Sequence, residues 1–264
     1  FSDQVKEIIL YSTTKNTSAD NEDNNELIKS GSKTFTTLDG YKNRLTDENK
    51  KVLYSTDEVS QSTALNMWTS QGKEVLKLDT VIDTQFIPWL EEKNKEINFV
   101  RVDSELDESI KDDSPEIADK DGNTKSETLK KMISSALNNE KVTVQVQSLK
   151  GENSPPSLIL LPEQMRRIND ITALMEQKLP GLPEYHNLIV NSNHPLIQGL
   201  LKLNSNTIVI EGSSKSEEGQ LANDIAIHVY EMAKLSIGGL ENKDIAAFQA
   251  RNAELLGKLM KNFV

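Results

Sequence analysis

Short strand-like runs alternate with amphipathic helical segments through the first hundred residues, and this alternation restricts the possible folds more than any other feature. Strands are predicted at 51–55 and 74–78, and helices at 37–49, 62–70 and 84–93. Parallel strands need long crossover connections, which are usually helical. The order of elements therefore predicts a parallel α/β sheet covered by helices.

The start of the chain carries two more local signals. Val5, Ile8 and Ile9 have helical spacing, so a helix is expected within residues 1–15, ending near the sequence YSTT. Thr37 precedes the sequence LDGYKNRL and is expected to cap the helix that follows, because a Thr hydroxyl accepts a hydrogen bond from the first helical turn.

An acidic stretch, residues 103–122, separates this part of the chain from the rest. It has few large apolar side chains and is interrupted by Pro115 and Gly122. Domain boundaries fall in such polar stretches, so the prediction is a first domain over 1–105, an acidic linker over 106–124 and a second domain over 125–264. An ordinary charged loop or helix start is the alternative.

The second domain is predicted to be a mixed α/β domain that ends in a helical bundle. Val142, Val144 and Val146 alternate with polar residues, the pattern of a half-buried strand. Pro162 is placed to begin a helix. Further strands are predicted at 157–161, 188–190 and 208–210, and further helices at 125–137, 217–236 and 243–262.

Composition excludes several classes of protein. The net charge is −11, which argues against a nucleic-acid partner, because such binding depends on Lys and Arg. The absence of cysteine excludes disulfides and thiolate metal sites and is compatible with a reducing cytoplasm. No apolar run approaches the roughly 20 residues of a membrane span. The chain opens at Phe1 rather than Met, so a fragment of a longer protein is expected.

Familiar catalytic and metal motifs are missing. His186, His194 and His228 are too scattered to suggest a metal site, so none is expected. The sequence GSSKS at 212–216 imitates a phosphate loop but has Ser214 where a glycine should precede the lysine. A nucleotide-dependent α/β enzyme that uses this loop stays an alternative function.

Two apolar helical stripes could be either core or binding surface. The helix after Pro162 can pack on its own domain or bind varied partners, since methionine adapts its shape. The last helix can dock on its own domain or pair with another subunit. The first stripe consists of Met165, Ile168, Ile171 and Met175, with Leu174 beside them, and the second of Ile245, Phe248, Asn252, Leu255 and Leu259, flanked by Leu256 and Phe263.

Five segments, taken together and in order, resemble the HtpG family of ninety-kilodalton heat-shock chaperones. They are VKEIILYSTTK, TFTTLDGYKNRLTDENKKVLYST, GKEVLKLDTVIDTQFIPWL, LIVNSNHPLI and GGLENKDIAAFQARNAELL. The resemblance implies that residues 1–105 are the last α/β/α part of the middle domain and that the remainder is the C-terminal dimerisation domain. It also implies that the nucleotide-binding domain is absent. This fragment would then use no cofactor and hydrolyse no ATP, whereas the whole protein would use ATP and Mg²⁺.

The resemblance further implies which residues meet partners. The expected partners are a second copy of the chain and non-native client proteins, in the cytoplasm of a bacterium, with no nucleic acid and no membrane. A purely structural dimerisation module is the remaining alternative. Client contacts would involve Met165, Ile168, Ile171, Leu174, Met175, Phe86 and Trp89, and the dimer interface would involve Ile245, Phe248, Asn252, Leu255, Leu256 and Leu259.

Overall fold

The computed structural model divides the chain into two compact units, residues 1–105 and 106–264. Each unit is described by itself. The structure describes residues 8–15, 27–45, 50–106, 111–112, 124–151, 154–162, 164, 167–168, 175, 185–208 and 217–261. Most of the predicted acidic linker and most of the predicted Pro162 helix therefore lie outside the described residues.

The first unit contains a mixed sheet with strand order β2-β3-β1-β5-β4-β6. β4 and β5, which correspond to the two predicted strands, are parallel, and β6, which was not predicted, is parallel to β4. β1 is antiparallel to both β3 and β5, and β2 is antiparallel to β3. The prediction of an all-parallel sheet is therefore wrong for half of the strands. The bounds are β1 (Tyr11–Thr13), β2 (Leu27–Ser30), β3 (Lys33–Thr36), β4 (Lys51–Ser55), β5 (Leu76–Lys77) and β6 (Asn98–Arg101).

The helices of this unit are α2 (Leu38–Asn43), α3 (Ser62–Ser70) and α4 (Val81–Lys93). The predicted cap is confirmed, because the Gly40 backbone N–H donates to the Thr37 hydroxyl at 3.1 Å. α4 begins three residues earlier than predicted. Thr80 and Asp83 form a capping box there, in which the Thr80 backbone N–H donates to the Asp83 carboxylate at 2.9 Å.

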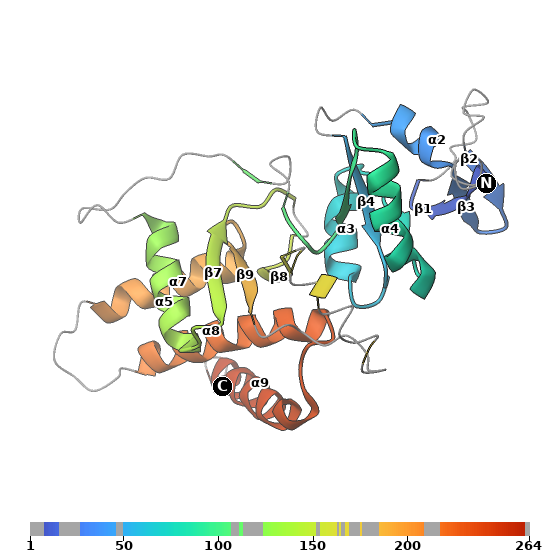
Figure 1. Cartoon of the computed structure of the whole chain (residues 1–264). Helices are drawn as coiled ribbons and strands as arrows, with labels where there is room; N and C mark the ends of the chain where they lie inside the picture. The colour runs from blue at the N-terminus through green and yellow to red at the C-terminus, as the bar shows by residue number, and fades with distance from the viewer. Residues whose placement is uncertain are drawn as a thin grey trace. The chain divides into compact units, whose positions relative to one another are not determined.

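Helices cover both faces of this sheet. One face packs Val52 and Tyr54 of β4 against Tyr41 of α2 and Leu90 of α4. Leu53 points to the other face by strand alternation. Figure 1 shows α3 and α4 on opposite sides of β4. The first unit is thus an α/β/α arrangement, as the resemblance to the HtpG family implied.

The second unit is built on a three-stranded sheet with order β7-β9-β8. β7 (Val142–Gln147) is parallel to β9 (His186–Asn191), and β8 (Ser157–Leu160) is antiparallel to it. The predicted alternating strand at Val142 to Val146 is confirmed. The predicted strand at 208–210 is wrong at its first residue, because α7 (Pro195–Ile208) ends there, and residues 209–210 lie outside the described residues.

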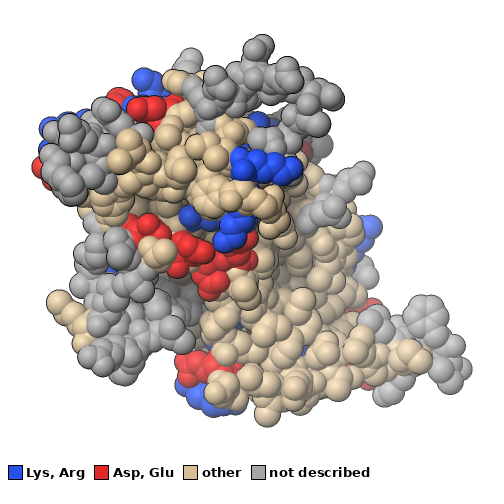
Figure 2. Space-filling model, turned by 90° about the vertical axis from the view of Figure 1, so that its right-hand side faces the viewer, with Lys and Arg blue, Asp and Glu red and all other residues tan. Residues whose placement is uncertain are grey.

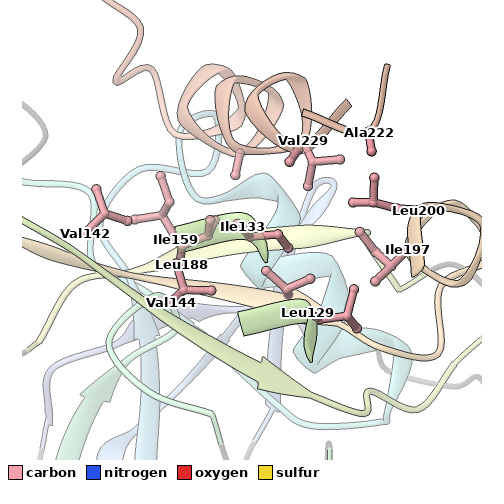
Figure 3. Packing of buried hydrophobic residues seen from close by; sticks show 13 residues of the cluster. Leu129, Ile133, Val142, Val144, Ile159, Leu188, Ile197, Leu200, Ala222 and Val229 are labelled. Atoms are coloured by element: carbon pink, nitrogen blue, oxygen red, sulfur yellow. The ribbon is translucent and has the colours of Figure 1, made fainter. Parts of the chain in front are cut away.

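Three helices cover one face of this sheet and form its core (Figure 3). They are α5 (Lys125–Leu137), α7 and α8 (Glu217–Ser236). α5 begins at a capping box between Thr124 and Glu127. The buried core side chains include Leu129, Ile133, Val144, Leu188, Ile197, Ala226 and Val229. The last helix, α9 (Asn242–Lys261), follows α8 and packs against it.

Asn191 at the end of β9 joins three loop segments. Its side-chain oxygen accepts hydrogen bonds from the backbone N–H groups of Leu149 and Asn193, each at 3.1 Å. Its amide nitrogen donates to the Pro155 carbonyl at 3.2 Å. The side chain is almost fully buried. The polar sequence NSNHP therefore shapes the turn between β9 and α7.

Candidate self-association and client-binding surfaces

α8 separates the core of the second unit from α9. Ala222, Ala226, Val229 and Ala233 are buried against the core, at the spacing of one helical face. Small alanine side chains let α8 approach the core closely. α9 packs against another side of α8.

Ion pairs join the facing sides of α8 and α9. Their order along the two helices is reversed, so the helices run antiparallel as a hairpin. Gly238, in the connection, has φ +67°, a backbone conformation that favours glycine. The pairs are Lys234 with Asp244 at 3.8 Å, Arg251 with Glu231 at 3.3 Å and Lys258 with Asp224 at 3.1 Å.

One aromatic contact lies between these ion pairs. The His228 and Phe248 rings are stacked, with centroids 5.3 Å apart and planes 7° apart. His228 Nδ1 is buried and has no hydrogen-bond partner among the described residues. Burial, and secondarily the positive charge of Arg251, lowers the pKa of His228. A neutral imidazole therefore fits this position better than a charged one.

The structure divides the predicted dimer stripe between two sides of α9. Phe248 contacts α8 of its own chain, and Leu255 falls on the same side by helical spacing and is half-buried. Leu256 is 53% exposed and lies on the neighbouring side, together with Ile245 and the half-buried Asn252. The side chain of Leu259 lies outside the described residues.

Sequence reasoning missed three exposed apolar side chains of this hairpin. Met260 on α9 is 61% exposed, and Met232 and Leu235 on α8 are also exposed. Met260 follows Leu256 by four residues and lies on the same side of α9. Extending the predicted apolar stripe by one helical turn would have included it. The apolar surface of the hairpin consists of Met232, Leu235, Ile245, Leu256 and Met260.

The predicted client-binding residues fall into two groups. Ile168 is 60% exposed and Met175 is 81% exposed, whereas Met165, Ile171 and Leu174 lie outside the described residues. In the first unit, the rings of Phe86 and Trp89 are stacked with centroids 4.8 Å apart. Both are half-buried and pack against the core cluster of that unit, so their contacts are shared between core and surface.

His186 and His194 form contacts with neighbouring residues of the fold. A ring nitrogen of His186 lies 3.0 Å from the Tyr230 hydroxyl, and the two rings stack. Burial, with a smaller effect of Asp244, raises the pKa of Tyr230 to about 12. His194 Nδ1 accepts a hydrogen bond from the Leu196 backbone N–H at 3.1 Å, at the start of α7. The described residues contain no cluster of three His, Asp or Glu side chains suited to a metal.

Charges on the face drawn in Figure 2 are mixed. Asp and Glu side chains gather beside Lys and Arg side chains, and uncharged residues cover wide areas between them. Among the helices of the described residues, none has the length and apolar character needed to cross a membrane. The GSSKS loop at 212–216 lies outside the described residues.

Comparison with known proteins identifies the family. The family model described as Hsp90 protein matches residues 24–262. The chaperone protein HtpG of Porphyromonas gingivalis is 31% identical over 191 residues, which cover 63% of this chain and 27% of that protein. The HtpG proteins of Bacteroides fragilis and Bacteroides thetaiotaomicron are 30% and 29% identical, over 61% and 59% of this chain and 24% and 23% of their own lengths.

The chain thus spans about a quarter of the length of these curated relatives. The family match begins before β2 and extends past the end of α9, so it includes every strand of the first unit except β1, and the whole helical hairpin. The chain therefore belongs to the Hsp90 protein family.

Proposed function

We propose that this chain supplies the self-association and client-binding parts of a longer ATP-dependent chaperone. The observation that carries the proposal is the apolar surface of the α8–α9 hairpin, whose side chains are exposed, together with the fact that no described side chain of α9 is buried within the chain itself. In this proposal, residues 1–105 are the end of the middle domain and residues 125–264 are the dimerisation domain.

The occupant of the hairpin surface is a second copy of the chain. Two copies related by a two-fold axis would place the same patch against itself, as in other symmetric dimers. Two antiparallel hairpins then form a four-helix bundle, in which exposed apolar side chains become core. Sedimentation of the chain should give the mass of two copies. A chain that stays monomeric at concentrations well above roughly 10 μM would contradict the proposal.

Client binding is proposed for the surface that includes Ile168 and Met175. Their exposure leaves a flexible thioether and a branched side chain in contact with solvent, and flexible methionine suits partners of varied shape. Replacing Met165, Ile168 and Met175 with Ser should leave the melting temperature nearly unchanged and weaken suppression of client aggregation several-fold. The measurements are thermal melting and light scattering of an aggregating client protein.

A matched control replaces the half-buried Phe86 with Ser. Because Phe86 packs against the core of the first unit, we expect this variant to lose stability, in contrast to the triple variant. A large loss of stability in the triple variant would mean that its three side chains are core. Full aggregation suppression by a stable triple variant would leave the chain as a purely structural dimerisation module.

ATP and Mg²⁺ are proposed as ligands of the longer protein and not of this chain. Calorimetric titration of the chain with ATP is expected to give no binding isotherm, because the GSSKS loop lacks the glycines that let the backbone surround a phosphate. Micromolar binding that is lost in a Lys215→Ala variant would support a nucleotide-dependent enzyme instead. The cysteine-free composition suits the cytoplasm, where we place the protein.

A further inference from the structure

We propose that His228 makes the α8–α9 hairpin sensitive to pH, so that mild acid loosens the hairpin and weakens self-association. The effect on self-association rests on the proposed dimer. The loosening of the hairpin concerns one chain alone and depends on the contacts between its last two helices.

The geometry around His228 favours the neutral ring. The ring lies flat on Phe248, and its Nδ1 is buried without a hydrogen-bond partner among the described residues. In the neutral form, the proton can reside on Nε2, and Nδ1 is then an unused acceptor. Protonation creates a charged N–H group at Nδ1 that is shielded from solvent and meets no acceptor in the described part of the chain, and such a group is costly to bury.

The neighbouring charges do not offset this cost. Asp224 and Glu231, one turn away from His228 on α8, are paired with Lys258 and Arg251 of α9. Among the described residues, both carboxylates beside the ring are therefore already engaged by cations. Arg251 adds a positive charge that opposes protonation of His228.

The direction of the pH effect follows from these contacts. The pKa of His228 is lowered in the closed hairpin, from an ordinary value of 6.5 that an open hairpin would restore. The open form then binds more protons, so the closed form is fully favoured above pH 6.5 and loses stability as the pH falls below it. The pKa of Glu231 is raised, mainly by burial. Protonation of Glu231 in the closed form would therefore favour closure as the pH falls, which is the opposite direction.

Hydrogen exchange of the α9 amides tests whether mild acid loosens the hairpin. Protection factors, which correct for the intrinsic effect of pH, should be measured at pH 7.5 and pH 5.5. We expect the protection of α9 to fall about three- to tenfold in the natural chain, since one proton changes an equilibrium by at most about tenfold per pH unit. A His228→Gln variant should show less than about a twofold change.

Two further variants make the result specific. His228→Phe keeps an aromatic ring against Phe248 and cannot be protonated, so it replaces the Gln variant if that one is unstable. The pKa of His194 is also lowered by burial, but His194 lies at the start of α7, so His194→Gln should keep the natural response of α9. Equal loss of α9 protection in the natural chain and in both His228 variants would overturn the proposal.

Sedimentation at the same two pH values tests whether mild acid weakens self-association. The dissociation constant of the dimer should rise about tenfold or more at pH 5.5 in the natural chain, because the two dissociated chains open their hairpins and together take up two protons that the dimer does not bind. It should stay constant in His228→Gln. A dissociation constant that is unchanged while α9 loses protection would overturn the coupling. A chain that is monomeric at pH 7.5 would overturn the proposed dimer, and the exchange measurement would still decide the hairpin switch.

Discussion

Aspartate in place of Leu256 and Met260 should convert the dimer to a monomer. Both side chains are exposed on the same side of α9 and would be buried between two copies. A dimer would lose four buried apolar side chains at about 1.5 kcal/mol or more each, so the dissociation constant should rise by roughly 10⁴-fold. The four new carboxylates would also lose water at the interface, which adds to the effect. Sedimentation equilibrium measures the change.

The matched control places the same two charges on another side of α9. Ala247 and Ala250 are exposed and lie away from the Leu256 side by helical spacing. The pair Ala247→Asp and Ala250→Asp should keep the dimer, with a similar small loss of helix propensity. If the Leu256 and Met260 variant stays dimeric with an unchanged dissociation constant, the self-association surface lies elsewhere.

Replacing Asn191 with Leu should strongly destabilise the second unit. The change removes the partners of two backbone N–H groups, at Leu149 and Asn193, and of the Pro155 carbonyl. Each buried group left without a partner costs about 1–3 kcal/mol. For the three groups the total is about 3–9 kcal/mol, which should lower the melting temperature of this unit by about 10 °C or more. Calorimetry of the full chain measures it.

Asn223→Leu is the control for this substitution. Asn223 is exposed on α8, so the same exchange of side chains should change the free energy of unfolding by less than about 0.5 kcal/mol. A melting temperature of the Asn191→Leu variant within about two degrees of the natural chain would show that the loops around β9 are held by other contacts.

Elements with strong local signals could be predicted from the sequence. α3 and α5 have the predicted bounds because their apolar spacing and flanking residues act within the helix itself. The strands β1, β2 and β3 could not be predicted in this way. They have three or four residues each, and their conformation depends on pairing between distant segments, such as Tyr11 with Thr36 and Thr13 with Leu76. Strand formation of this kind depends on context more than on local propensity.

The candidate surface was predictable only in outline. The apolar residues of α9 were identified, but which of them contact α8 depends on the antiparallel hairpin, whose register is set by pairs such as Arg251 with Glu231. Met232 and Leu235 were missed because α8 also carries buried apolar residues on its core face. A one-dimensional pattern does not distinguish the two faces of a helix that is apolar on both.

The strand order of the second unit has a consequence for synthesis of the chain. Its central strand, β9, comes last of the three strands, and the core also needs Ala233 of α8. At about 5–20 residues per second, the ribosome takes roughly 5–20 s to proceed from Val142 to Ala233. The sheet of the first unit is complete at Arg101. The nascent chain therefore carries all the strands of the first unit while the valines and leucines of β7 and β8 still lack the strand and the helix that bury them, and during this interval these apolar side chains are exposed to other proteins.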